Sequence, residues 1–98
     1  MQEILQLFGS NQTFLTQDEA YFYQCELEKF LKTTQKDLED LRSKNVNYRE
    51  SGIYAVVKEW SENQDAKVLY FRLRALWISN PTKNATAILG IVEAITNN

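Results

Sequence analysis

Hydrophobic and polar positions follow helical periods along most of the chain. The longest such stretch runs from residue 17 to about residue 44 without a Gly or Pro. Thr16 followed by Glu19 has the spacing of a capping box at its start. Its apolar or small positions recur in steps of three and four, the spacing of one helix face: Ala20, Tyr23, Leu27, Leu31, Thr34, Leu38 and Leu41. We therefore predict one long helix over residues 17–44, of about 28 residues and ~42 Å.

The second half of this helix, residues 32–44, has a narrow apolar seam of the kind that coiled coils use. A chain of 98 residues offers few internal partners for so long a helix. We therefore predict that the chain forms a homodimer through it. The residues predicted to bind a partner are Tyr21, Tyr23, Phe30, Leu38 and Leu41, with Arg42 and Asp40 on the rim.

Two further apolar segments lie between residues 53 and 79. Ile53, Val56, Val57 and Trp60 recur as on one face of a helix. Residues 66–79 are apolar nearly all round, which is typical of a buried central helix. A strand is the alternative for this segment, because apolar residues also alternate with Tyr and Arg there, and residues 53–57 could pair with it. We favour the helix, because 14 residues exceed the usual strand length.

The two ends of the chain predict one helix each. A stripe of Ala85, Ile88, Leu89, Val92 and Ile95 indicates a last helix over about residues 83–96. Residues 2–8 predict a short helix that buries Ile4, Leu5 and Phe8. The expected fold is a single all-α domain over residues 1–98, a small bundle of four to five helices with one long helix. The alternative is α+β, with a β-hairpin over residues 53–78 packed on the long helix.

One segment resembles a known repeat. Over 34 residues from Glu50, the apolar spacing resembles one tetratricopeptide helix pair, carried by Ile53, Val56, Trp60, Leu69, Leu73 and Leu76, with Pro81 closing the unit. Val57, Leu69 and Leu76 stand where that family has small residues, and no second copy precedes or follows. The resemblance implies an antiparallel pair of helices.

The residues that usually carry catalysis or bind metals are sparse. The chain has no His and a single Cys, Cys25, which acidic neighbours would keep as an inert thiol. Asp37, Glu39 and Asp40 lie within one turn of one helix among basic residues, which is typical of a solvated face rather than a metal site. No glycine-rich phosphate loop or nucleophile motif occurs. We expect a protein that is not an enzyme and that binds no cofactor or metal.

Charge favours a protein partner over nucleic acid. The net charge is −2, and residues 17–44 carry seven acidic and five basic residues, which account for all of it. The alternative is a nucleic-acid-binding regulator that uses Lys67, Arg72 and Arg74 with the aromatic residues between them. Residues 1–9 lack the basic start of a signal peptide, and no apolar run could span a membrane. We expect a cytoplasmic interaction module of the adaptor, regulator, immunity or chaperone type.

Overall fold

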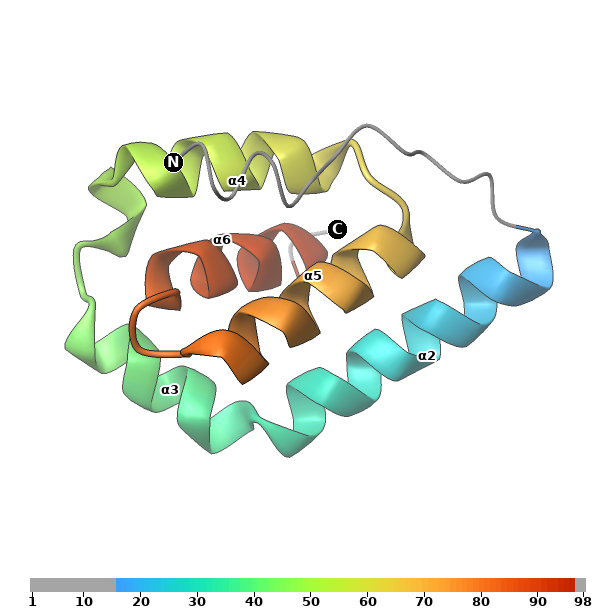
Figure 1. Cartoon of the computed structure of the whole chain (residues 1–98), viewed down its shortest axis with the longest axis horizontal. Helices are drawn as coiled ribbons and strands as arrows, with labels where there is room; N and C mark the ends of the chain where they lie inside the picture. The colour runs from blue at the N-terminus through green and yellow to red at the C-terminus, as the bar shows by residue number, and fades with distance from the viewer. Residues whose placement is uncertain (1–15, 97–98) are drawn as a thin grey trace.

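The computed structural model describes residues 16–96, and every regular element in that range is helical (Figure 1). The elements are α2 (Gln17–Thr33), α3 (Gln35–Lys44), the 3-10 helix η1 (Tyr48–Glu50), α4 (Gly52–Glu62), α5 (Ala66–Ser79) and α6 (Ala85–Thr96). The prediction of an all-helical fold is confirmed for this part of the chain. Residues 53–78, the alternative hairpin, form α4 and α5 instead. The helix predicted over residues 2–8 lies outside the described residues.

Polar side chains fix where three of the helices begin. The N–H of Glu19 donates to Thr16 Oγ1 at 3.2 Å, as the capping-box spacing predicts. The Thr16 hydroxyl in turn donates to the Glu19 carboxylate at 3.3 Å. Ser51 and Asp65 accept from first-turn amides of α4 and α5. Each of these bonds satisfies an amide that has no partner within its own helix.

The central helix of the fold is α6, which the other helices surround (Figure 1). It packs most extensively against α4 and also contacts α3, α5 and η1. Nine of its residues are buried: Ala85, Ala87, Ile88, Leu89, Gly90, Ile91, Val92, Glu93 and Ala94. The prediction that residues 66–79 form the buried central helix is therefore wrong. The helix over those residues, α5, buries only one side, through Leu69, Leu73 and Leu76.

The charges of the two apolar helices account for this difference. α5 carries Lys67, Arg72 and Arg74, and each would need a partner if it were enclosed. α6 carries a single charged residue, Glu93, and several small ones that allow neighbouring helices to approach closely. Enclosing α6 therefore buries more apolar surface with fewer unpaired charges.

The predicted long helix is divided in two at Thr34, where the chain bends between α2 and α3 (Figure 1). The Thr34 hydroxyl donates to the carbonyl of Phe30 at 2.6 Å, and the Thr33 hydroxyl donates to the same carbonyl at 3.1 Å. Threonine hydroxyls that bond back to the preceding turn compete with the backbone and bend helices. Because of the bend, α2 lies along α5 while α3 packs against α6. The straight helix of ~42 Å was therefore a wrong prediction.

Two aromatic contacts fix how α2 lies against α5. Tyr23 meets Tyr70 with ring centroids 5.8 Å apart, and Phe30 meets Trp77 at 5.6 Å. Both pairs join residues 47 positions apart, so the two helices run parallel and in constant register over two turns. α4 and α5 run in opposite directions, as the tetratricopeptide resemblance implied (Figure 1). However, α4 packs mainly against α6 rather than against α5.

The contact between α4 and α6 at Gly90 generates a stability prediction. A Cβ at Gly90 would lie 3.4 Å from the Tyr54 ring and 3.5 Å from the Val57 side chain, which is ordinary contact. We expect Gly90→Ala to raise the free energy of unfolding by about 0.5–1 kcal/mol through helix propensity. Gly90→Leu should lower it by roughly 2 kcal/mol, because the larger side chain overpacks the same contact.

Urea denaturation followed by circular dichroism measures both changes. Gly52→Ala is the matched control, because nothing lies within 4 Å of a Cβ at that exposed position. A Gly90→Ala variant less stable than the parent chain would show that α4 and α6 pack more closely than this contact allows.

Candidate interaction surface

The aromatic run Tyr21–Phe22–Tyr23 divides between two sides of α2. Tyr23 is half-buried, and its ring lies 5.6 Å from that of Phe71 on α5. Phe22 packs edge-on against Tyr23 at 5.1 Å and stays 55% exposed. Tyr21 points to another side and is 74% exposed, and its pKa lies above the usual value because its hydroxyl shares a hydrogen bond with Cys25. Phe22, Tyr23 and Phe71 thus form one continuous aromatic area across the two helices.

An exposed apolar stripe continues this area along α5. Phe71, Ala75 and Ile78 follow each other at the spacing of one helix face, and all three are exposed. The exposed fractions are 50% for Phe71 and 74% for Ile78, which is high for large apolar side chains. Exposed apolar side chains that lie together, rather than singly, mark interaction sites.

Charged residues lie along the same sides of both helices. Asp18 and Glu26 are one turn from Phe22 on α2, and Lys67 and Arg74 flank the stripe on α5. The Arg74 guanidinium donates to the Tyr70 hydroxyl at 3.1 Å and lies 5.5 Å over that ring. We call this surface the α2–α5 face and define it by Asp18, Phe22, Glu26, Lys67, Phe71, Arg74, Ala75 and Ile78.

The predicted partner-binding residues are not gathered on one surface. Leu38 and Leu41 are buried in the core, where α3 packs against α6, so neither is presented to a partner. Their apolar seam is covered inside the domain, because the bend at Thr34 turns α3 toward α6. Phe30 is half-buried against Trp77, with the rings edge to face. Of the predicted residues, Tyr21 on α2 is exposed. Asp40 and Arg42 are also exposed, but they lie apart from it on α3.

Those two are the predicted rim residues. Asp40 forms an ion pair with Lys44 at 3.1 Å, and both side chains are well exposed. Arg42 lies at the edge of a shallow cavity of about 200 Å³ between α3 and α6, which Leu38 and Val92 also line. The exposed ion pair between Asp40 and Lys44 contributes little to stability, about 0.5 kcal/mol. The residues that sequence reasoning missed are Phe22, Phe71 and Ile78.

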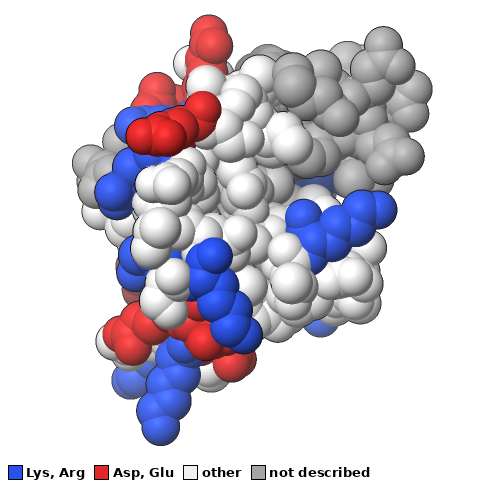
Figure 2. Space-filling model, turned by 90° about the vertical axis from the view of Figure 1, so that its left-hand side faces the viewer, with Lys and Arg blue, Asp and Glu red and all other residues white. Residues whose placement is uncertain are grey.

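The basic residues predicted for nucleic acid do not share one side of α5. Lys67 and Arg74 are seven residues apart and lie on the same side, whereas the helix turns Arg72 away by well over a quarter of the circumference. Burial lowers the pKa of Arg72. Figure 2 shows a different side of the molecule, where the chain passes from α3 to α4, and acidic and basic side chains are intermingled there around a broad uncharged area. A protein that neutralises several phosphates needs a continuous basic patch instead.

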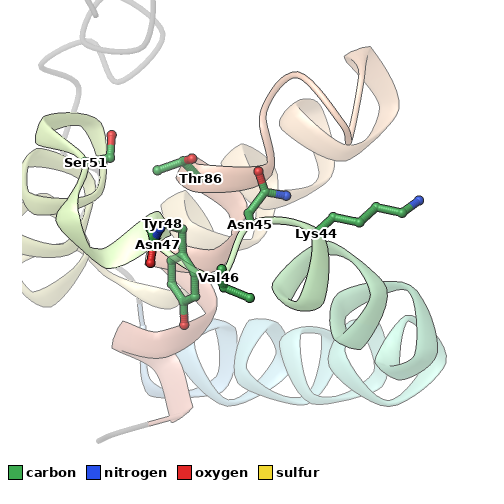
Figure 3. A pocket seen from close by; sticks show the side chains of 7 residues that line it. All are labelled: Lys44, Asn45, Val46, Asn47, Tyr48, Ser51 and Thr86. Carbon is green, nitrogen blue, oxygen red and sulfur yellow. The ribbon is translucent and has the colours of Figure 1, made fainter.

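A second hollow lies where η1 joins α3 to α4, with a volume of about 290 Å³ (Figure 3). Its polar side chains hold helix ends. The Asn45 amide donates to the carbonyl of Leu41 at 2.8 Å, and Ser51 caps α4. The Tyr48 ring points its hydroxyl away from the other labelled side chains (Figure 3). These groups do not converge on a point where a substrate atom could sit.

Two kinds of feature are absent from the range 16–96. Within it, no group of three or more His, Cys, Asp or Glu side chains is placed to hold a metal ion. None of its helices combines the length and the hydropathy that crossing a membrane requires.

One strongly perturbed ionisable group is Glu93, which lies buried on the central helix. Arg49 of η1 donates to it from Nε at 2.8 Å and also from a terminal nitrogen, and the Tyr54 hydroxyl donates to the other carboxylate oxygen. The hydrogen bonds from Arg49 lower the pKa of Glu93 to about 2 against the opposing effect of burial. The bond to Glu93 raises the pKa of Tyr54. This network attaches η1 and α4 to α6.

The sequence indicates one of the two charged residues of this network, Glu93, but not its partner. Glu93 is the only charged residue in α6, and a single charge in an apolar helix predicts a buried partner. Arg49 lies 44 residues earlier in the chain, in the polar break between two predicted helices, and no local spacing connects the two. Only the packing of η1 against α6 brings them together.

No protein-family model matches the chain, and comparison with curated proteins and with solved structures also found no match. The role of the α2–α5 face is therefore inferred from its residues and their contacts alone.

The Glu93 network predicts how stability depends on pH. Its pKa falls from an ordinary value of 4.5 to about 2 on folding, so the ion pair stabilises the fold above pH 4.5. This contribution, up to about 3 kcal/mol, should be lost as the pH falls from about 4.5 to about 2. Glu93→Gln should remove most of it at neutral pH and flatten the acid dependence in that range.

Urea denaturation between pH 2 and pH 7 measures both effects. Glu28→Gln, an exposed change of the same kind on α2, is the control and should follow the parent chain. If Glu93→Gln kept the full acid dependence, other carboxylates would be responsible for it.

Proposed function

We propose that this chain is a small, non-catalytic protein-interaction module that acts through the α2–α5 face and self-associates. The observation that carries the proposal is the exposure of Phe22 on α2 and of Phe71 and Ile78 on α5, all within the α2–α5 face. Aromatic residues at the centre of a polar rim are the usual anchors of protein interfaces.

The distribution of apolar residues within α5 supports this proposal. Its inner side chains, Leu69, Leu73 and Leu76, are enough to hold it against the core. Phe71 and Ile78 add little to that packing, and polar residues would serve an exposed helix surface as well. Their presence is explained if a second protein covers them.

The remaining parts of the proposal concern chemistry and location. We propose no catalytic activity, because the polar side chains around the hollow at η1 are occupied with helix ends. We propose a cytoplasmic location, because a single cysteine, Cys25, is compatible with a reducing compartment and cannot form a disulfide within the chain.

Nucleic-acid binding through α5 is the alternative that the sequence left open. One observation favours it, namely that α5 carries three basic residues and no acidic residue. Two arrangements weaken it. Arg72 lies on a different side from Lys67 and Arg74, and the acidic residues Asp18 and Glu26 lie on the neighbouring α2.

Capture of partner proteins tests the proposed function. We expect that a tagged chain with Ile78→Asp retains less than about a tenth of the bound protein, because a buried carboxylate without a partner costs several kcal/mol. Val46→Asp is the matched control, since Val46 is 71% exposed but lies in the loop before η1. Quantitative mass spectrometry of the captured proteins, including untagged copies of this chain, gives the measurement. Equal losses for both variants would contradict a role for this face.

Titration with DNA and RNA tests the alternative. We expect no mobility shift with a duplex or a single strand at about 50 mM salt, where phosphate contacts are strong. Binding that weakens steeply with salt and is lost in Lys67→Glu would instead support the nucleic-acid function.

A further inference from the structure

We propose that the occupant of the α2–α5 face is a second copy of this chain, placed so that α2 of each copy covers α5 of the other. The inference rests on the proposed function, which includes self-association, and adds how the two copies are placed on each other. It follows from the charges of the face and from the register of its two helices.

The two halves of the face carry opposite charges. On α2, Asp18 and Glu26 lie one turn before and one turn after Phe22. On α5, Lys67 and Arg74 lie one turn either side of the Phe71 level, and the helix has no acidic residue. Asp18 and Lys67 form no ion pair within residues 16–96, and Glu26 contacts Lys29 at the long distance of 3.5 Å. The face therefore has an acidic half and a basic half, each incompletely neutralised.

The register places these charges at matching levels. Each α2 residue lies level with the α5 residue 47 positions later, as the Tyr23–Tyr70 and Phe30–Trp77 contacts show. Asp18 is therefore within two residues of the level of Lys67, and Glu26 within one residue of the level of Arg74. Two residues correspond to only about 3 Å along a helix, which a Lys or Arg side chain spans easily.

A two-fold axis parallel to α2 and α5 would place these opposite charges against each other in two copies of the chain. Rotation about such an axis keeps levels unchanged and exchanges the two helices, so α2 of one copy lies over α5 of its partner. Both copies then contribute the same contacts, as a closed two-fold dimer requires. In each of the two equivalent contacts, acidic residues of α2 from one copy lie against basic residues of α5 from the other. Phe22 of one copy meets Phe71 of the other near the centre. Ala75 leaves room for the approaching helix beside Ile78.

Charge reversal on each half separately tests the arrangement. The first variant, Asp18→Lys with Glu26→Lys, has a face that is basic on both helices. The second, Lys67→Glu with Arg74→Glu, has a face that is acidic on both helices. We expect each variant alone to dissociate at least tenfold more readily than the parent chain, because like charges oppose each other across the axis. An equal mixture should dimerise again, because every contact then joins opposite charges.

Sedimentation equilibrium of the full chain measures the masses, and circular dichroism verifies that each variant keeps its helices. The charge reversals Asp37→Lys and Lys36→Glu on the exposed side of α3 are matched controls and should leave the dimer unchanged. Ile78→Asp supplies a second test that changes no charge pair, and it should also yield monomers.

Three results would overturn the proposal. The parent chain could remain a monomer up to about 1 mM, which excludes the dimer and self-association, while the capture experiment with Ile78→Asp still decides whether the α2–α5 face binds another protein. The two charge variants could dimerise as tightly as the parent chain, which places the dimer contact elsewhere. The mixture of variants could stay monomeric, which excludes the crossing of α2 over α5.

Discussion

The fold depends on the enclosure of a single helix. α6 buries almost every residue from Ala85 to Ala94, and α3, η1, α4 and α5 all contact it. Gly90 and the alanines keep its radius small, so the helices around it can approach closely. One polar group, Glu93, is enclosed with it and is satisfied by Arg49 and Tyr54.

The bend at Thr34 follows from that enclosure. A straight helix over residues 17–44 could contact α5 or α6 along part of its length only. Two threonine hydroxyls that bond to the carbonyl of Phe30 divide it and let each part face its own neighbour. α2 then follows α5 through its aromatic contacts, and the apolar residues of α3 pack against α6. The narrow seam that suggested an external partner has its partner inside the domain.

Local patterns in the sequence were sufficient for the positions and starts of the helices, because caps such as Thr16 and periodic apolar residues act within a few residues. They were not sufficient to choose the central helix. Residues 66–79 and 83–96 are both apolar, and the choice depends on long-range packing and on the three basic residues of α5. The same holds for the site. The sequence predicts Tyr23 as a partner-binding residue, whereas it predicts a core position for Phe71 and Ile78, because residues 66–79 have the pattern of an enclosed helix.

The exposed face of α5 is therefore a consequence of the choice of α6 as the core. Because only one side of α5 is covered, Phe71 and Ile78 remain in contact with water. Burying these two side chains against a partner would supply favourable free energy for association. The charged residues nearby decide which partner this face favours. A partner with unrelated charges would leave the acidic half on α2 or the basic half on α5 unmatched. A second copy matches both at once, because the register of α2 and α5 within one chain is also the register across a two-fold axis parallel to them.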